Sequence, residues 1–303
     1  MTRNDRHRIV ERRLLVGALV CAVIFVISYS VFVATPWGHQ FDDDAFLARK
    51  SLTRKIVALD AGILDLVRKS TLLLAAIVTL IIAAIRRCTF VGVIALAASG
   101  CAVIGAEALK HVLPWAALVP GDASLESGFQ MNTFPSGHAT IGTSLALVLL
   151  LLSPCRWRPW LAVLSGFISA TFATGVLFAG WHRPSDALGA LAWSGLCMSV
   201  AGAFAIRLLG EPRAPLATPV AAILSSASLG ILVTIATWLV SSAAGSEYIF
   251  ADLPFFVLTG SIVAGAFTLS AWYGWQLRAV DWHDDHVLLQ RLTGRTARVA
   301  SPK

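Results

Sequence analysis

The chain has 303 residues, of which 57% are apolar and only 14% are charged, and it carries a net charge of +7. A soluble domain cannot bury so large an apolar fraction, so the composition excludes a soluble protein and indicates one that is integral to a membrane. The basic residues are dispersed rather than gathered in one stripe, and the sequence holds no motif that binds DNA or RNA. We therefore expect the lipid bilayer as a partner and no nucleic acid.

Residues 1–13 are basic and precede an apolar run at 14–35, which is longer than the hydrophobic region of a signal peptide. Because no small-x-small cleavage pattern lies near Ala34, we expect this run to remain as an anchor helix. Seven further runs are long enough, or nearly so, to cross about 30 Å of hydrocarbon. They lie at 71–86, 89–109, 138–154, 159–180, 187–206, 216–241 and 253–275. The sequence thus predicts an all-α, polytopic membrane helical bundle.

The positions of Lys and Arg predict the orientation, because cytoplasmic loops retain basic residues. With eight spans and both termini in the cytoplasm, the basic residues at 86–87, 156–158 and 207–213 also face the cytoplasm. The loop 36–70 opposes this assignment, since six basic residues lie in it on the outer side. We expect a multi-pass protein of the plasma membrane.

The loop 36–70 combines an acidic segment, Phe-Asp-Asp-Asp-Ala-Phe at 41–46, with a stretch at 56–70 in which apolar residues recur at helical spacing. The apolar residues are Ile56, Leu59, Ile63, Leu64 and Val67. The spacing suits an amphipathic helix on the membrane surface, and we favour that interpretation over a lid across a lipid site.

A first polar cluster, Phe-Pro-Ser-Gly-His-Ala at 134–139, stands where an apolar run meets water. The segment from Pro135 to Gly137 predicts a turn, and His138 begins the next span, so unpaired backbone N–H groups face the solvent. Such a helix start binds anions, and Gly137 lets an anion approach while Ser136 can donate from its hydroxyl. A simple helix cap explains the same residues equally well.

A second polar cluster, Gly-Trp-His-Arg-Pro-Ser-Asp at 180–186, begins another span. His182 and Asp186 are four residues apart, so on a helix they share a face, and the carboxylate could hold one ring nitrogen protonated while the other faces a substrate. An imidazole oriented in this way is a plausible nucleophile toward phosphorus. Taken alone, an interfacial His and Arg beside a capping Asp is the simpler explanation.

A third span ends with Lys110 on the same predicted outer face. Snorkelling of a lysine from a helix end would account for this residue without any function. Three separate span ends nevertheless bring groups that suit a phosphate to one side of the membrane. This joint arrangement predicts phosphate chemistry.

On these residues the chain resembles the type 2 phosphatidic acid phosphatases, the PAP2 family, which share their core with the vanadium-dependent haloperoxidases. The family has three blocks: a Lys followed by Arg-Pro, then Pro-Ser-Gly-His, then Ser-Arg with a later His and an Asp four residues after it. Pro135–His138 completes the second block. His182 and Asp186 retain the third, and Lys110 retains the first. The resemblance covers about residues 70–206 and implies a six-helix core supplied by the first six spans.

The resemblance also implies a reaction. His182 would attack phosphorus to give a phosphohistidine, Asp186 would orient it, and His138 would protonate the leaving oxygen and then help to activate water. No metal and no organic cofactor are implied. We therefore predict a membrane phosphatase that hydrolyses a lipid phosphate or an isoprenoid diphosphate at the outer membrane face.

The phosphate cradle implied by the resemblance consists of Lys110, Ser136 and the backbone N–H of Gly137. Both arginines with which the family binds phosphate are absent: Val176 stands where one is expected, and no Arg follows the lysine of the first block. Losing one preorganised donor typically costs about 10²–10³ in rate. We hypothesise that Arg183, together with His111, supplies the missing charge, with a contact of Arg183 to lipid headgroups as the alternative.

Two other functions are weighed against hydrolysis. The first is a catalytically weak or silent lipid-phosphate binder or transporter, in which the His and Asp serve structure or proton coupling. The second, haloperoxidase activity, is disfavoured because those relatives are soluble and depend on a fuller cationic cage. The sequence does not distinguish a hydrolase from a phosphotransferase, and water is taken as the acceptor.

We divide the chain into a cytoplasmic N-terminus at 1–13, a PAP2-like core with the outer-face site at 14–206, two further transmembrane helices within 207–275 and a cytoplasmic polar tail at 276–303. The two further helices are assigned only packing or partner contact. The His and Asp residues at 281–286 could bind a metal, but a solvated tail is favoured. The five cysteines show no CxxC spacing, so we expect reduced, structural thiols.

Overall fold

The computed structural model describes residues 3–49, 67–114, 132–209 and 253–278, together with positions 62, 64–65, 211–212, 228, 232 and 280–282. The elements in chain order are α1 (Arg3–Ser28), the π-helical turn η1 (Tyr29–Val33), α2 (Pro36–Ala48), α4 (Lys69–Ile85), α5 (Thr89–Val112), α7 (Gly137–Leu152), α8 (Arg158–Phe178), α9 (Pro184–Leu209), β1 (Glu211–Pro212), α11 (Leu253–Gln276) and β2 (Val280–Asp281). The two-residue strands β1 and β2 pair antiparallel. The described chain is therefore all-α in class, as predicted.

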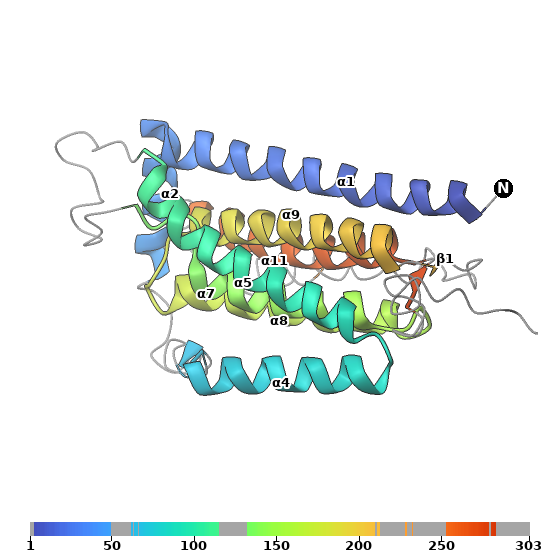
Figure 1. Ribbon diagram of the computed structural model, residues 1–303. Helices are drawn as coiled ribbons and strands as arrows, with labels where there is room; N and C mark the ends of the chain where they lie inside the picture. The colour runs from blue at the N-terminus through green and yellow to red at the C-terminus, as the bar shows by residue number, and fades with distance from the viewer. Residues whose placement is uncertain are drawn as a thin grey trace, which may run out of the picture.

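The long helices run side by side and form a bundle (Figure 1). α9 contacts α1, α5, α7 and α11, and α8 packs against α7 and α11. α4 packs on α5 along one side of the bundle, and α2 covers one end of it. α11, the last of the predicted spans, thus lies among the helices of the predicted core.

The helices match the predicted membrane spans. Among the described residues, five helices are long and apolar enough to cross a membrane: α1 continued by η1, α5, α8, α9 and α11. α4 and α7 are shorter apolar helices. Large apolar side chains are exposed on several of these helices, among them Leu19, Leu73, Ile104 and Phe204. Exposure of this kind requires a lipid environment, so the chain is a multi-pass membrane protein.

Three predictions from the sequence concern residues that the structure does not describe. They are the span at 216–241, most of the amphipathic stretch at 56–70 and the tail after residue 282. Of that stretch, Leu64 is described, and its side chain is buried against the apolar core rather than exposed.

A tight reversal after α1 brings α2 over the end of the bundle, in a part of the chain for which no helix was predicted. Thr35 caps α2 by accepting a hydrogen bond from Gly38 N–H at 3.1 Å, and Pro36 occupies the first turn, where a missing N–H leaves no bond unmade. A Cβ on Gly38 would lie 2.0 Å from the carbonyl oxygen of Val31, so the close approach requires glycine. Phe46 anchors α2 in an apolar cluster with side chains of α8, α9 and α11.

A buried arginine at the start of α8 holds the opposite end of the bundle. Arg158 is only 1% exposed. Its guanidinium donates to the carbonyl oxygens of Ser153 at 2.5 Å, Val280 at 2.9 Å and Leu277, and its Nε donates to Ser153 Oγ at 3.2 Å. These carbonyls follow the ends of α7 and α11, where helices leave acceptors without partners. Arg158 therefore ties α11 to α7 and α8.

Arg158→Met is expected to destabilise the protein by about 3 kcal/mol or more, because several buried carbonyls would lose a charged donor. The measurement is the thermal unfolding temperature of the protein in detergent. Arg156→Met is the matched control, since Arg156 is exposed two residues earlier and its loss should change stability little. Equal effects of the two substitutions would contradict the role assigned to Arg158.

Candidate active site

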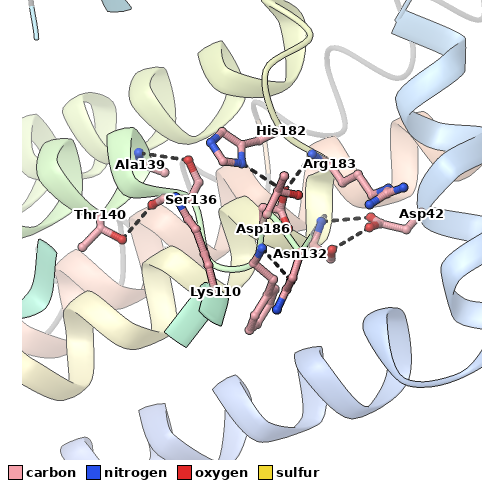
Figure 2. A network of polar contacts seen from close by, with 12 residues as sticks. Asp42, Lys110, Asn132, Ser136, Ala139, Thr140, His182, Arg183 and Asp186 are labelled. Carbon is pink, nitrogen blue, oxygen red and sulfur yellow. Dashed lines mark hydrogen bonds and ion pairs between the residues drawn. The ribbon is translucent and has the colours of Figure 1, made fainter. Parts of the chain in front are cut away.

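Three helix ends meet where α2 covers the bundle: the end of α5 and the starts of α7 and α9. Figure 2 shows Lys110, Ser136, His182 and Asp186, which these ends contribute, in one group. His138 lies on the first turn of α7, and its ring packs against Trp181, the residue before His182. The structure therefore gathers these sequence-predicted residues in one place.

The start of α7 is a fully formed helix cap. Ser136 Oγ accepts a hydrogen bond from Ala139 N–H at 3.4 Å, and the Ser136 carbonyl accepts from the N–H and hydroxyl of Thr140 at 3.0 and 2.8 Å. The Ser136 N–H donates to the carbonyl of Asp186 at 3.0 Å, which joins the start of α7 to the start of α9. Capping accounts for the position of Ser136, and its hydroxyl hydrogen is still able to serve an anion.

The Asp186 carboxylate organises the start of α9. Asp186 is 2% exposed, and its Oδ2 accepts from Thr133 Oγ1 at 2.6 Å and from Arg183 N–H at 3.1 Å. The same oxygen lies 3.0 Å from His182 Nδ1, the contact expected from the spacing of the two residues. Because a carboxylate only accepts hydrogen bonds, Nδ1 carries the hydrogen and Nε2 holds the free lone pair.

The end of α8 fixes the loop that carries His182. Gly180 has a φ of +74°, the left-handed conformation that commonly ends a helix. The N–H groups of Trp181 and His182 both donate to the carbonyl of Val176, at 2.9 and 3.1 Å. The Val176 side chain is fully buried in the apolar core, so this position contributes a backbone acceptor rather than a charge. The Trp181 ring packs edge-on against His138 with 5.1 Å between ring centroids, which keeps both imidazoles at the same end of the bundle.

An acidic residue lies inside the predicted phosphate cradle. Lys110 Nζ donates to Glu107 Oε1 at 2.8 Å. A Cβ placed on Gly137 would lie 2.6 Å from Glu107 Oε1 and 3.8 Å from Lys110 Nζ. The ion pair therefore rests against the start of α7, where backbone N–H groups and the helix dipole attract negative charge. Glycine at position 137 leaves the space that this contact needs.

The Arg183 side chain points away from His182 and toward α2 (Figure 2). Arg183 is 3% exposed, and its Nε donates to Asp43 Oδ1. Asp43 Oδ2 also lies 3.3 Å from Nε2 of His39. Ser185, two residues further on, donates to Asp42 from its N–H at 2.9 Å and from its Oγ at 2.5 Å. This geometry does not support the phosphate-binding role hypothesised for Arg183, because Asp43 engages its guanidinium.

Sequence reasoning missed four side chains that belong to this group. They are Asp42, Asp43, Glu107 and Thr133. The sequence did contain an indication for three of them. Asp42 and Asp43 belong to an acidic run in an otherwise basic loop, and Glu107 is the sole charged residue of the apolar run 89–109. A charge inside a membrane span is by itself a reason to expect function. Thr133 carried no signal, because only the fold brings it to Asp186.

The geometry defines a membrane helical bundle with a histidine and carboxylate site at one end. Residues 88–207 match the family model of the PAP2 superfamily. The family expected from the sequence is thereby confirmed. A solved structure described as the first transmembrane PAP2 type phosphatidylglycerolphosphate phosphatase from Bacillus subtilis aligns with 63% of this chain and 94% of that chain, at 18% identity and a TM-score of 0.46. No curated protein matches the chain.

Glu107→Gln is expected to strengthen the binding of orthovanadate, an anion of the shape and charge of phosphate. The substitution removes the carboxylate that rests against the start of α7 and pairs with Lys110. Exposed ion pairs contribute about 0.2–1 kcal/mol, so the affinity should rise by a factor of roughly 1.4 to 5. Titration calorimetry in detergent measures the change, with Glu11→Gln on α1 as the control. Unchanged or weaker binding would show that Glu107 does not compete with an anion.

Asp42 is expected to make stability depend on pH. Burial raises the pKa of Asp42 to about 8, so at neutral pH it is an uncharged acid, whereas the unfolded chain ionises at the ordinary value of 3.8. Because the pKa of Asp42 is higher in the folded protein than in the unfolded chain, protonation of Asp42 stabilises the fold. This contribution to the free energy of unfolding is complete below about pH 4 and is lost progressively as the pH rises toward about 8.

Asp42→Asn removes this titration, and its amide can keep both contacts with Ser185. The unfolding temperature of the wild type should therefore fall relative to that of Asp42→Asn between about pH 5 and about pH 8. A difference that stays constant with pH would rule out titration of Asp42 in this range.

Proposed function

We propose that the protein is a membrane phosphatase that hydrolyses a lipid phosphate or an isoprenoid diphosphate through a phosphohistidine intermediate. One observation carries the proposal: the 3.0 Å contact between His182 Nδ1 and Asp186 Oδ2 leaves Nε2 as a free nucleophile. His138 lies against the neighbouring Trp181 and supplies a second imidazole at the same place. The match of residues 88–207 to the PAP2 superfamily model supports chemistry on a phosphate.

In the first step, Nε2 of His182 attacks phosphorus, and a P–N bond forms as the P–O bond to the leaving group breaks. His138 in its protonated form donates its proton to the leaving oxygen. The attacking ring becomes positive, and the Asp186 carboxylate stabilises that charge. In the second step, neutral His138 takes a proton from water, which attacks phosphorus and breaks the P–N bond.

The cradle stabilises the phosphoryl oxygens as negative charge moves onto them. Lys110, the hydroxyl of Ser136 and the backbone N–H of Gly137 are the proposed donors. Their action requires the Lys110 ammonium to exchange its bond with Glu107 for a bond to the substrate. None of these roles requires a metal or an organic cofactor.

The position of the site favours an amphiphilic substrate at the outer face of the plasma membrane. A site at the mouth of a helical bundle can take a headgroup while the tail stays in the bilayer. The described basic residues of the opposite end support this orientation, because basic residues favour the cytoplasmic side. They include Arg8, Arg12 and Arg13 of α1, and Arg86, Arg87, Arg156, Arg158, Arg207 and Arg278 near other helix ends.

A silent lipid-phosphate binder is the second candidate, and two observations favour it. Glu107 neutralises the lysine of the cradle. Val176 is a buried aliphatic residue at the place where the family resemblance leads one to expect an arginine. A site with fewer cations binds phosphate less strongly, and the transition state more weakly still.

Turnover by the purified protein distinguishes the two candidates. Protein in detergent with a chelator should release phosphate from phosphatidic acid or undecaprenyl diphosphate, and His182→Ala should lower the rate about 10³-fold or more. Arg156→Ala, which changes an exposed residue near the opposite end of the bundle, should leave the rate unchanged. Activity that persists in His182→Ala would exclude the nucleophile, and a wild type inactive on the whole lipid panel would favour the silent binder.

A further inference from the structure

We infer that α2 positions the nucleophile, with Asp43 acting on His182 through Arg183. The inference rests on the proposed function, because the orientation of His182 matters for a reaction in which it attacks phosphorus. It also gives Arg183 a role other than that of a phosphate ligand. Arg183 is the residue through which Asp43 of α2 binds the loop before α9.

The first link between α2 and this loop is a buried ion pair. Asp43 is fully buried and Arg183 is 3% exposed, with Nε of Arg183 donating to Oδ1 of Asp43. Burial alone opposes ionisation of Asp43, but the contact with His39 and the charge of Arg183 outweigh it and hold the pKa of Asp43 below its ordinary value. Removing one member of such a pair leaves a buried charge uncompensated. The pair therefore fixes the Arg183 side chain strongly.

The second link lies on the other side of Pro184. Ser185 donates to Asp42 from both its backbone N–H and its hydroxyl, at 2.9 and 2.5 Å. Proline has a fixed φ, so the residues that flank it cannot turn independently. Two adjacent aspartates of α2 thus hold the chain on both sides of the first residue of α9.

α2 is itself firmly held, which a positioning element requires. Ala45 and Phe46 are fully buried in an apolar cluster that includes Leu177 of α8, Ala187 of α9 and Leu258 of α11. Because residues three and four apart share a helix face, Asp42 and Asp43 lie on the same buried face of α2 as Ala45 and Phe46, and this one face makes both the polar and the apolar contacts. A movement of α2 would therefore disturb its apolar packing and the contacts of its aspartates at the same time.

The effect reaches His182 through a shared acceptor. The backbone N–H of Arg183 donates to Asp186 Oδ2, the same oxygen that lies 3.0 Å from His182 Nδ1. Release of the Arg183 side chain would let its backbone shift and would change the direction in which Asp186 holds the imidazole. A misplacement of about 1 Å can lower a rate about 10²-fold.

Asp43→Asn tests the inference, with Asp44→Asn as the matched control, since Asp44 is the exposed next residue of the same helix. In Asp43→Asn, kcat for phosphate release should fall about 10²-fold while KM changes less than about threefold, because orientation rather than binding is lost. Asp44→Asn should retain the wild-type values. An unchanged kcat in Asp43→Asn would overturn the inference.

Arg183→Met, alone and combined with Asp43→Asn, separates positioning from phosphate binding. If Arg183 acts together with Asp43, the double variant should lose no more kcat than either single variant. Inhibition by orthovanadate should then stay within about threefold of the wild type. Weaker inhibition by orthovanadate in every variant that lacks Arg183 would show that the arginine binds the phosphoryl group, and it would overturn the inference.

A spectroscopic measurement tests the inference without turnover. The ¹⁵N shifts of labelled histidine report the tautomer of His182, which should be the Nδ1–H form in the wild type and in Asp44→Asn, and a mixture in Asp43→Asn. If Asp43→Asn does not fold, Ser185→Ala replaces it, because it breaks one link without leaving a buried charge. An unchanged tautomer overturns the inference, whereas an inactive wild type with the expected tautomers overturns the proposed function alone.

Discussion

The site depends on one buried carboxylate oxygen. Asp186 Oδ2 receives hydrogen bonds from Thr133 before α7 and from the backbone of Arg183 before α9, and it contacts the ring of His182. A carboxylate removed from water needs such donors, because an uncompensated buried charge is very unfavourable. The segment before α7 and the segment before α9 therefore have to converge on Asp186. Their convergence places the start of α7 beside the start of α9, where Ser136 N–H donates to the Asp186 carbonyl, and it selects one tautomer of the imidazole.

Polar side chains hold both ends of a largely apolar bundle, and a buried arginine acts differently at each end. Arg158 donates to backbone carbonyls beyond the ends of α7 and α11, so it closes the end away from the site. Arg183 pairs with Asp43 and joins α2 to α9 at the site itself. Apolar packing between helices allows them to slide or rotate, whereas these directional contacts specify one arrangement. The precision needed for chemistry therefore comes from few residues near the helix ends.

The helices of the bundle and the meeting of Lys110, His138 and His182 could be predicted, because apolar runs reveal spans and each of these residues stands at the end of one. The direction of Arg183 could not. Its chain position beside His182 suggested a shared ligand, yet neighbouring residues at a helix start point in different directions, and its partner Asp43 is 140 residues away. The helix α2 was missed for the same reason, since its stability comes from distant packing partners rather than from its own sequence pattern. Glu107 was visible as a charge within a span, but only the fold shows that it faces Gly137.

The central claim is that a covalent bond forms between Nε2 of His182 and phosphorus. The most direct test mixes the protein rapidly with a lipid substrate carrying radioactive phosphate, stops the reaction in alkali, in which phosphohistidine survives, and locates the label by mass spectrometry of the peptides. The account predicts labelled protein with the phosphoryl group on His182, and no label in a variant that lacks this imidazole. Phosphate attached to another residue, or product formed by direct attack of water without any labelled protein, would contradict it.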